Sequence, residues 1–264
     1  MNSPNAERKN WFDQGGQAYA RFRPEYPPAL AAYLASLAPD TAVAVDVGCG
    51  NGQLSKLLAA HFEAVAGFDP SEDQIAHAAP QENVVYGCAP AEELPLPSRS
   101  ASLITAAQAA HWFDLPRFYA EVRRVAAPDA ILALVSYGVL RLGGELGARF
   151  EQFYWHEIGP YWPAERKLVD SGYSTIDFPF TELQGPPIAI ELEWRLEEFL
   201  GYISTWSAVR SAREAGREDL LHRFAADIAE PWGDPTTRHS ITWPINMRIG
   251  RLWATCIPRH FQWG

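Results

Sequence analysis

A glycine-rich turn is the sharpest chemical feature of the sequence, which here reads Asp46-Val-Gly48-Cys-Gly50-Asn-Gly52. Glycines allow a tight turn and let backbone N–H groups approach a ligand at the start of a helix. Asp69 follows at the end of the next apolar segment, where a carboxylate can accept hydrogen bonds from both hydroxyls of a ribose. A glycine-rich turn alone also fits a connection that binds nothing. Strand, turn, helix, strand and acid in this order indicate a cofactor that contains a nucleoside.

Two details of the turn distinguish between the cofactor classes that use such a layout. Dinucleotide sites favour a third glycine where this chain has Gln53. Asp46 places an acid just before the first glycine, which repels a diphosphate and attracts the ammonium group of a methionine. The electrostatics therefore favour S-adenosylmethionine over NAD, and an NAD-dependent oxidoreductase stays as the weaker reading.

His111 and Tyr19 are the candidate catalytic residues. Methyl transfer from a sulfonium is an in-line displacement, so a carboxylate acceptor, ionised at pH 7, needs no general base. A hydroxyl or amine acceptor does, and His111 is then the candidate base. Local packing beside Trp112 is the other reading of His111. Tyr19 is a candidate lid residue over the sulfonium, or else part of an amphipathic helix face.

An acidic chain that binds an acid needs local positive charge. Lys and Arg number 22 and Asp and Glu 32, giving a net charge of −10. Arginine suits a carboxylate because its planar fork binds both oxygens. Arg21, Arg23 and Arg248 are the candidates, and pairing with surface carboxylates is the alternative for each. Trp206, like Trp243, is a candidate wall of the acceptor pocket or else a core residue.

The elements that position these residues alternate between strand and helix over 41–137, which favours a parallel sheet flanked by helices. Ser71 and Asp114 are placed to cap two of the helices. Five strands are expected in this region at Thr41–Val47, Ala64–Phe68, Val84–Tyr86, Ser102–Ala107 and Ile131–Tyr137.

Beyond Gly138 the period is less regular. Helices are expected near Ala148–Ile158 and Arg195–Phe224, and strands near Ser174–Phe180 and Ile241–Leu252. We expect one domain over 1–264. It comprises N-terminal lid or entry helices over 1–40, a cofactor-binding core over 41–137, and a sheet edge with a substrate-cap insertion over 138–264.

Composition bounds the partners. The net charge of −10, without any basic block, disfavours nucleic acid. The three cysteines, Cys49, Cys88 and Cys256, form neither a disulfide framework nor a metal-binding pair, so we expect no metal and a cytoplasmic location. The longest apolar run, Ala130–Leu140, is too short to span a bilayer, and the polar N-terminus has no signal core. We therefore expect no membrane partner.

Seven short motifs occur in order along the chain. They are Tyr19-Ala-Arg21-Phe-Arg23-Pro24-Glu-Tyr26-Pro27, Asp46-Val-Gly-Cys-Gly50-Asn-Gly52, Phe68-Asp69-Pro-Ser71, Ala91-Glu92-Glu-Leu94-Pro95, Gln108-Ala-Ala-His111-Trp112-Phe113, Thr205-Trp206-Ser207 and Trp243-Pro244-Ile-Asn-Met-Arg248. Together they resemble class I S-adenosylmethionine-dependent methyltransferases with a type 11 domain, and most closely the small-molecule subgroup of trans-aconitate methyltransferase-like proteins. The resemblance is strong over 41–137 and looser outside.

This resemblance implies a Rossmann-like α/β fold with a mostly parallel seven-stranded sheet and a C-terminal helical insertion. It also implies residue roles: Gly48 and Gly50 against the methionine, Asp69 on the ribose, Ala91 and Glu92 beside the adenine, and Gln108 beside the sulfonium. Where relatives often have a polar residue, Pro90 lacks a backbone donor, so Glu92 or backbone carbonyls must hold the adenine amino group.

The function expected from the sequence is S-adenosylmethionine-dependent methyl transfer to a small molecule, with a carboxylate or other small organic acid as the acceptor. The alternative is a protein that binds the same cofactor without transferring its methyl group and serves in sensing or interaction.

Overall fold

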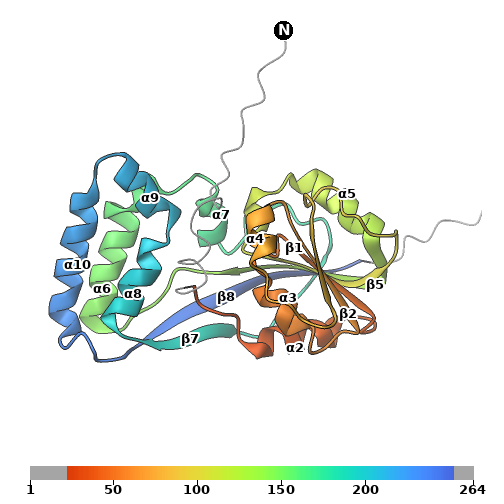
Figure 1. The fold of residues 1–264 in the computed structure, drawn as a ribbon, viewed down its shortest axis with the longest axis horizontal. Coiled ribbons are helices and arrows are strands. Elements are labelled where there is room, and N and C mark those ends of the chain that lie inside the picture. Colours follow the sequence, from red (N-terminus) through yellow and green to blue (C-terminus); the bar gives the residue numbers. More distant parts are fainter. Residues whose placement is uncertain (1–22, 253–264) are drawn as a thin grey trace, which may run out of the picture.

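A mixed sheet of eight strands forms the centre of the computed structural model, which describes residues 23–252 (Figure 1). The strand order is β3-β2-β1-β4-β5-β8-β6, and β7 pairs with β8. The first five strands run parallel, whereas β8 is antiparallel to β5, β6 and β7. The strands are β1 (Val43–Val47), β2 (Ala64–Asp69), β3 (Val84–Cys88), β4 (Ala101–Ala107), β5 (Ala126–Tyr137), β6 (Thr181–Leu183), β7 (Ile188–Trp194) and β8 (His239–Arg251).

Strand β5 shows why this part of the chain forms a buried sheet. Its residues alternate between two apolar clusters, with Ile131 and Val135 on one face and Leu132 and Leu134 on the other. Helices α2 (Pro28–Leu37) and α3 (Gln53–Leu58) supply apolar residues to the first face, and α5 (Leu115–Val125) to the second. A strand covered on both faces reads as a continuous apolar run, as the sequence of β5 does.

The two predicted helix caps are confirmed. Ser71 Oγ accepts a hydrogen bond from the backbone N–H of Gln74 at 3.3 Å and begins α4 (Glu72–Ala76). Asp114 Oδ1 accepts one from the N–H of Arg117, also at 3.3 Å, and begins α5. Each side chain satisfies a donor that the first helical turn leaves without a partner.

The residues after β5 form a helical part at one end of the sheet, and β7 and β8 extend towards it (Figure 1). Phe153 stacks on Phe224 with ring centroids 3.9 Å apart, and the same apolar cluster continues into the sheet at Val135. Its helices are α6 (Gly144–Gln152), the π-helical segment η2 (Phe153–Glu157), the 3-10 turn η3 (Gly159–Tyr161), α7 (Arg166–Asp170), α8 (Leu196–Ser204), α9 (Ser207–Glu214) and α10 (Glu218–Trp232).

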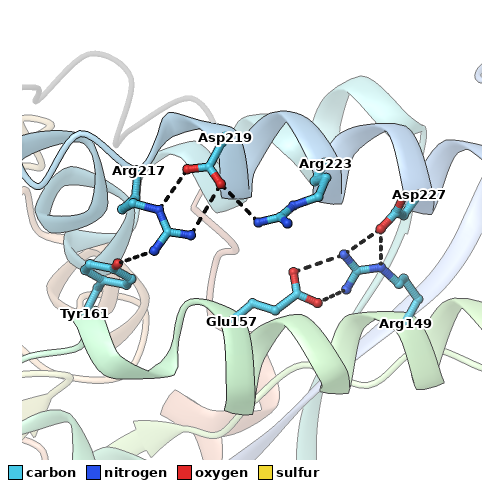
Figure 2. A network of polar contacts seen from close by, with 7 residues as sticks. All are labelled: Arg149, Glu157, Tyr161, Arg217, Asp219, Arg223 and Asp227. Atoms are coloured by element: carbon cyan, nitrogen blue, oxygen red, sulfur yellow. Dashed lines mark hydrogen bonds and ion pairs between the residues drawn. The ribbon is translucent and has the colours of Figure 1, made fainter.

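Arg149 links three segments of this helical part (Figure 2). Its terminal nitrogens bind the two carboxylate oxygens of Glu157 at 2.9 and 3.1 Å. The same side chain donates to Asp227 Oδ2 at 3.0 and 3.2 Å. Because Arg149 lies on α6, Glu157 ends η2 and Asp227 lies on α10, one guanidinium fixes their relative positions.

The Rossmann-like α/β class, the five parallel strands, the final strand and the helical insertion agree with the expectations from the sequence. The sheet is seven strands wide, as implied, but the edge beyond β8 is divided between β6 and β7, which makes eight. The prediction of a strand near Ser174–Phe180 is wrong. Tyr173 has a φ of 62° within a turn, and Phe178 and Phe180 pack edge-on against Tyr119 of α5.

Candidate active site

The glycine-rich turn joins β1 to α3 and needs glycine for steric reasons. Gly48 and Gly52 have φ angles of 69° and 86°, in the left-handed region that other residues avoid. A Cβ on Gly48 would lie 2.4 Å from Cβ of Ala109, and one on Gly52 would lie 2.2 Å from Oη of Tyr86. The turn therefore packs directly against neighbouring segments, which brings its backbone to the edge of a cavity.

Asp46 lies at the end of β1 under this turn and is 1% exposed. Its carboxylate accepts hydrogen bonds from Ser55 Oγ at 2.7 Å and from Thr105 Oγ1 at 2.9 Å. Burial raises the pKa of Asp46 to about 6, against the stabilising effect of the two hydroxyls on the charged form. A buried acid that titrates near neutrality can pair with a cationic ligand.

Asp69 ends β2 and ties two loops together. Oδ2 accepts the N–H of Gly50 and Oδ1 accepts the N–H of Ser71, each at 2.9 Å. Burial raises the pKa of this carboxyl above its usual value. A carboxylate has about four acceptor positions, so each oxygen of Asp69 keeps capacity for one hydroxyl of a ligand.

The opposite wall of the cavity comes from the loop after β3 and the end of β4. Glu92 Oε1 accepts the N–H of Asp114 at 2.7 Å, which fixes that loop to the start of α5. Gln108 has a φ of 53°, and its Nε2 donates to the carbonyl of Tyr137 at 3.1 Å. A left-handed glutamine at the end of a strand is strained backbone of the kind that occurs at ligand sites.

These walls enclose a cavity of about 440 Å³. All seven residues expected at the cofactor line it: Asp46, Gly48, Gly50, Asp69, Ala91, Glu92 and Gln108. Arg23 also lines it, and its Nη1 donates to Tyr137 Oη at 3.1 Å. The sequence reasoning missed Tyr26 and Tyr137. The position of Tyr137 at the carboxyl end of a central strand was the available signal, because ligands of such sheets bind there.

His111 lies beside the cavity but not among its lining residues. It belongs to the 3-10 turn η1 (Ala110–Trp112), and its Nδ1 lies 2.9 Å from Oη of Tyr173. Burial, and to a lesser extent the charge of Arg166, lowers the pKa of His111 to about 3. The ring is therefore neutral at physiological pH and a weak base.

The structure does not bring two other candidates to the cavity. Trp206 is 4% exposed and packs against Phe153 and Trp162 in the helical part. Arg248 forms an ion pair with Glu182 and donates to the carbonyls of Tyr173 and Ile176 at 2.8 and 3.1 Å. Trp243, weighed beside Trp206, is buried with its Nε1 donating to Tyr202 Oη. Tyr19 and Arg21 lie outside the described residues.

Comparison with known proteins gives an independent line of evidence. A family model described as a methyltransferase domain matches residues 45–134. A protein of Dictyostelium discoideum that is named as a methyltransferase is 36% identical over 228 residues, which cover 84% of this chain and 87% of that protein. A Mycobacterium tuberculosis protein, named as an uncharacterized methyltransferase, is 37% identical over 127 residues, about half of each chain. A solved structure from Anaeromyxobacter dehalogenans, described as a type II methyltransferase, is 46% identical, with a TM-score of 0.84 over 88% of this chain and 99% of that one.

Proposed function

Since this chain belongs to the S-adenosylmethionine-dependent methyltransferase family, we propose that it transfers the methyl group to a small organic acid, with a carboxylate oxygen as the acceptor. The observation that carries the choice of acceptor is the position of Arg23. Its guanidinium lines the same cavity as Gln108, and both side chains bind Tyr137. A cation at this end of the cavity suits an anionic acceptor.

The residues present fit the cofactor. Asp69 keeps free acceptor capacity for the ribose hydroxyls, and Asp46 offers a carboxylate to the ammonium group. Gly50 has a φ of 55° and lines the cavity, and a Cβ there would lie 3.6 Å from Gln74 Oε1, so its backbone is accessible to a ligand. Ala91 and Phe113 give the cavity an apolar wall beside Glu92 for the adenine. When bound, S-adenosylmethionine supplies a methyl group on a positively charged sulfur.

The acceptor side is built from Arg23 and Tyr137. Arg23 donates to Tyr137 Oη, and its Cζ lies 5.6 Å from the centre of the Tyr202 ring. The aromatic surroundings hold the guanidinium in place and reduce its contact with water, which strengthens its attraction for a carboxylate. Local positive charge also overcomes the repulsion between an acid and a chain of net charge −10.

A carboxylate acceptor agrees with the weak basicity of His111. A group with a pKa of about 3 takes a proton from a hydroxyl or amine poorly at pH 7. A carboxylate is already ionised and needs only to be positioned and shielded from water. Trp112, Phe113 and Tyr26 supply aromatic lining that displaces water from the cavity. His111 then has a positioning role beside Tyr173.

The finer assignments belong to the same proposal. The subgroup is the trans-aconitate methyltransferase-like one, supported by the motifs around Arg23 and Trp206. A cytoplasmic location is supported by the free thiols of Cys49 and Cys88. Within residues 23–252, no helix is long and apolar enough to cross a membrane. The names of the relatives favour an enzyme over a protein that only binds the cofactor.

The test has two stages. Isothermal titration should give binding of S-adenosylmethionine and S-adenosylhomocysteine, and none of NAD. Release of S-adenosylhomocysteine is then measured over a panel of small acids, each paired with its neutral amide. Turnover of at least one acid, with its amide inactive, supports the proposal. Turnover of amides, alcohols or amines alone contradicts the choice of acceptor, and NAD binding without a response to the sulfonium cofactor contradicts the whole assignment.

A further inference from the structure

Arg166, the first residue of α7, carries hydrogen-bond donors that the described residues leave without partners. Its side chain is 16% exposed. Nε donates to Asp170 Oδ1 at 2.9 Å and to Tyr154 Oη at 3.0 Å. Nη1 and Nη2 have no hydrogen-bond partner among residues 23–252. Four of the five N–H groups of a mostly buried guanidinium are therefore available, and they form the end that grips a carboxylate with two parallel bonds.

Among the described residues, the neighbours of Arg166 fix its side chain at Nε but do not pair with its terminal nitrogens, Nη1 and Nη2. Tyr154 Oη also donates to Asp170 Oδ1 at 2.7 Å, so the carboxylate is shared between two donors and touches the guanidinium only at Nε. The indole ring of Trp162 lies 4.6 Å from Cζ of Arg166. Nε1 of Trp162 is itself buried without a partner among the described residues. The buried Nε1 of Trp162 and the terminal nitrogens of Arg166 thus place hydrogen-bond donors without partners in the described part of the chain in one cluster, an arrangement that suits an anionic ligand.

The position of Tyr154 depends on an irregular helix. It lies in η2, where the helix widens to a π-helical turn between α6 and η3. Such turns change the direction of side chains and occur often at functional sites. Here the turn is held by the Arg149–Glu157 pair at its end (Figure 2).

Arg166 lies next to the cofactor cavity. In Figure 1, α7 lies between the other helices of the helical part and the half of the molecule that contains α4 and β1, and it packs against η1, whose Trp112 lines the cavity. The charge of Arg166 acts on His111 of η1 and on Tyr202. Arg23, which lines the cavity, also lies near Tyr202, with its Cζ 5.6 Å from the centre of that ring. Two arginines from distant parts of the sequence, Arg23 and Arg166, thus lie close enough to Tyr202 to act on its charge.

We propose that Arg166 is an acceptor-recognition residue, whose Nη1 and Nη2 bind a carboxylate of the small acid beside the cofactor cavity. This inference rests on the proposed function and adds to it a residue outside the resemblance and outside the family match. Asp170 and Tyr154 act as positioning residues that orient the guanidinium. His111, neutral and with no partner at Nε2 among the described residues, adds a polar wall without opposing charge.

The test compares Arg166→Gln and Arg166→Lys with Arg223→Gln. Arg223 is the control, because it lies on α10 in the same helical part and binds Asp219 away from the cavity. Arg166→Gln should raise KM for the best acid by about tenfold or more with a smaller effect on kcat, as expected when a bidentate ion pair to the substrate is lost. The KM of Arg166→Lys should lie between that of the wild type and that of Arg166→Gln. The affinity for S-adenosylhomocysteine, measured by titration, should change by less than about twofold in all three variants, because none of the replaced side chains lines the cofactor cavity.

A second readout does not need turnover. With S-adenosylhomocysteine present, the acid should raise the melting temperature of the wild type and of Arg223→Gln but not of Arg166→Gln, and its neutral amide should raise the melting temperature of none of them. If Arg166→Gln does not fold, Arg166→Lys is used for both readouts. An unchanged KM and an unchanged melting shift in the folded Arg166 variant overturn this inference and leave methyl transfer intact. A wild type that binds no sulfonium cofactor and turns over no acid overturns the proposed function, and this inference with it.

Discussion

Asp69 is the residue that we propose to hold the ribose of the cofactor. It holds the N–H groups of Gly50 and Ser71 and keeps acceptor capacity towards the cavity. Asp69→Ala should weaken binding of S-adenosylhomocysteine by about 1.5–3 kcal/mol, the usual scale for hydrogen bonds to a charged group. Titration calorimetry measures the change. A dissociation constant equal to that of the wild type would show that the ribose is held elsewhere.

Asp46 makes cofactor binding depend on pH. Its pKa of about 6 means that the carboxylate takes up a proton as the pH falls through this value. A cationic ammonium group favours the ionised form, so affinity should rise from pH 5 to pH 7 and then level off. One pH unit below the pKa, the loss is at most about tenfold. Titrations with S-adenosylhomocysteine at several pH values measure it, and Asp46→Asn should bind weakly and lose most of the dependence.

The same ionisation acts on stability with a defined sign. The folded-state pKa of Asp46 lies above the reference value of 3.8, so the protonated form favours folding. Its contribution to the free energy of unfolding is complete below pH 3.8 and is lost as the pH rises through about 6. Asp46→Asn should therefore flatten the decline of the melting temperature over this range. A wild-type melting temperature that rises there more steeply than that of the variant would contradict the burial of an ionised group.

At the scale of elements, the ion-pair network of Figure 2 fixes how the helices of the helical part lie together. Arg149 joins α6, η2 and α10, and its side chain is 17% exposed. Arg149→Gln should lower the free energy of unfolding by about 1 kcal/mol, at the upper end for ion pairs near a surface. Arg223 is 59% exposed and binds Asp219 alone, so Arg223→Gln should cost less than about 0.5 kcal/mol. Denaturant unfolding compares the two, and equal effects would mean that the network adds nothing.

Elements with a simple period could be predicted from the sequence. The strands of the cofactor half could, because alternation over two buried faces gives the continuous apolar runs seen in β5, and the caps Ser71 and Asp114 have side chains suited to one task. Ser174–Phe180 could not. This segment is rich in aromatic residues, as strands often are, yet Phe178 and Phe180 pack against Tyr119 of α5 after the turn at Tyr173. Such tertiary contacts override the local preference for a strand.

The residues of the candidate site likewise comprise some that the sequence could predict and some that it could not. The seven residues expected at the cofactor belong to local motifs, each at or just after the carboxyl end of one of the strands β1 to β4. Arg166 has no such signal, because its place beside η1 results from α7 packing across a long separation in sequence. Arg23 and Arg248 could not be distinguished by residue type. Arg23 lines the cavity, whereas Arg248 binds the carbonyls of a turn.

At the scale of the whole molecule, one apolar cluster extends from the sheet through the helical part. We therefore expect residues 23–252 to unfold as one cooperative domain. Trp155, Trp162, Trp206 and Trp232 lie in the helical part, and Trp194 and Trp243 pack against Tyr202 of α8. Among the described residues, tryptophan fluorescence therefore reports mainly on the helical part and its junction with the sheet, whereas far-ultraviolet circular dichroism reports on all elements. The two thermal transitions should coincide. Two separate midpoints would show that the helical part is a domain of its own.

The pairing of β5 with β8 bears on how such proteins diversify. Residues 138–238 form the helical part and the edge strands β6 and β7 before the chain pairs with β5 again in β8, and the N–H of Gly138 donates to the carbonyl of Pro244 at 2.8 Å. The residue that follows β5 is thus hydrogen-bonded directly to β8. The matching family model ends at residue 134, just before it. An insertion or a deletion between β5 and β8 would therefore leave the order of strands β1 to β5 unchanged, and with it the cavity at their carboxyl ends.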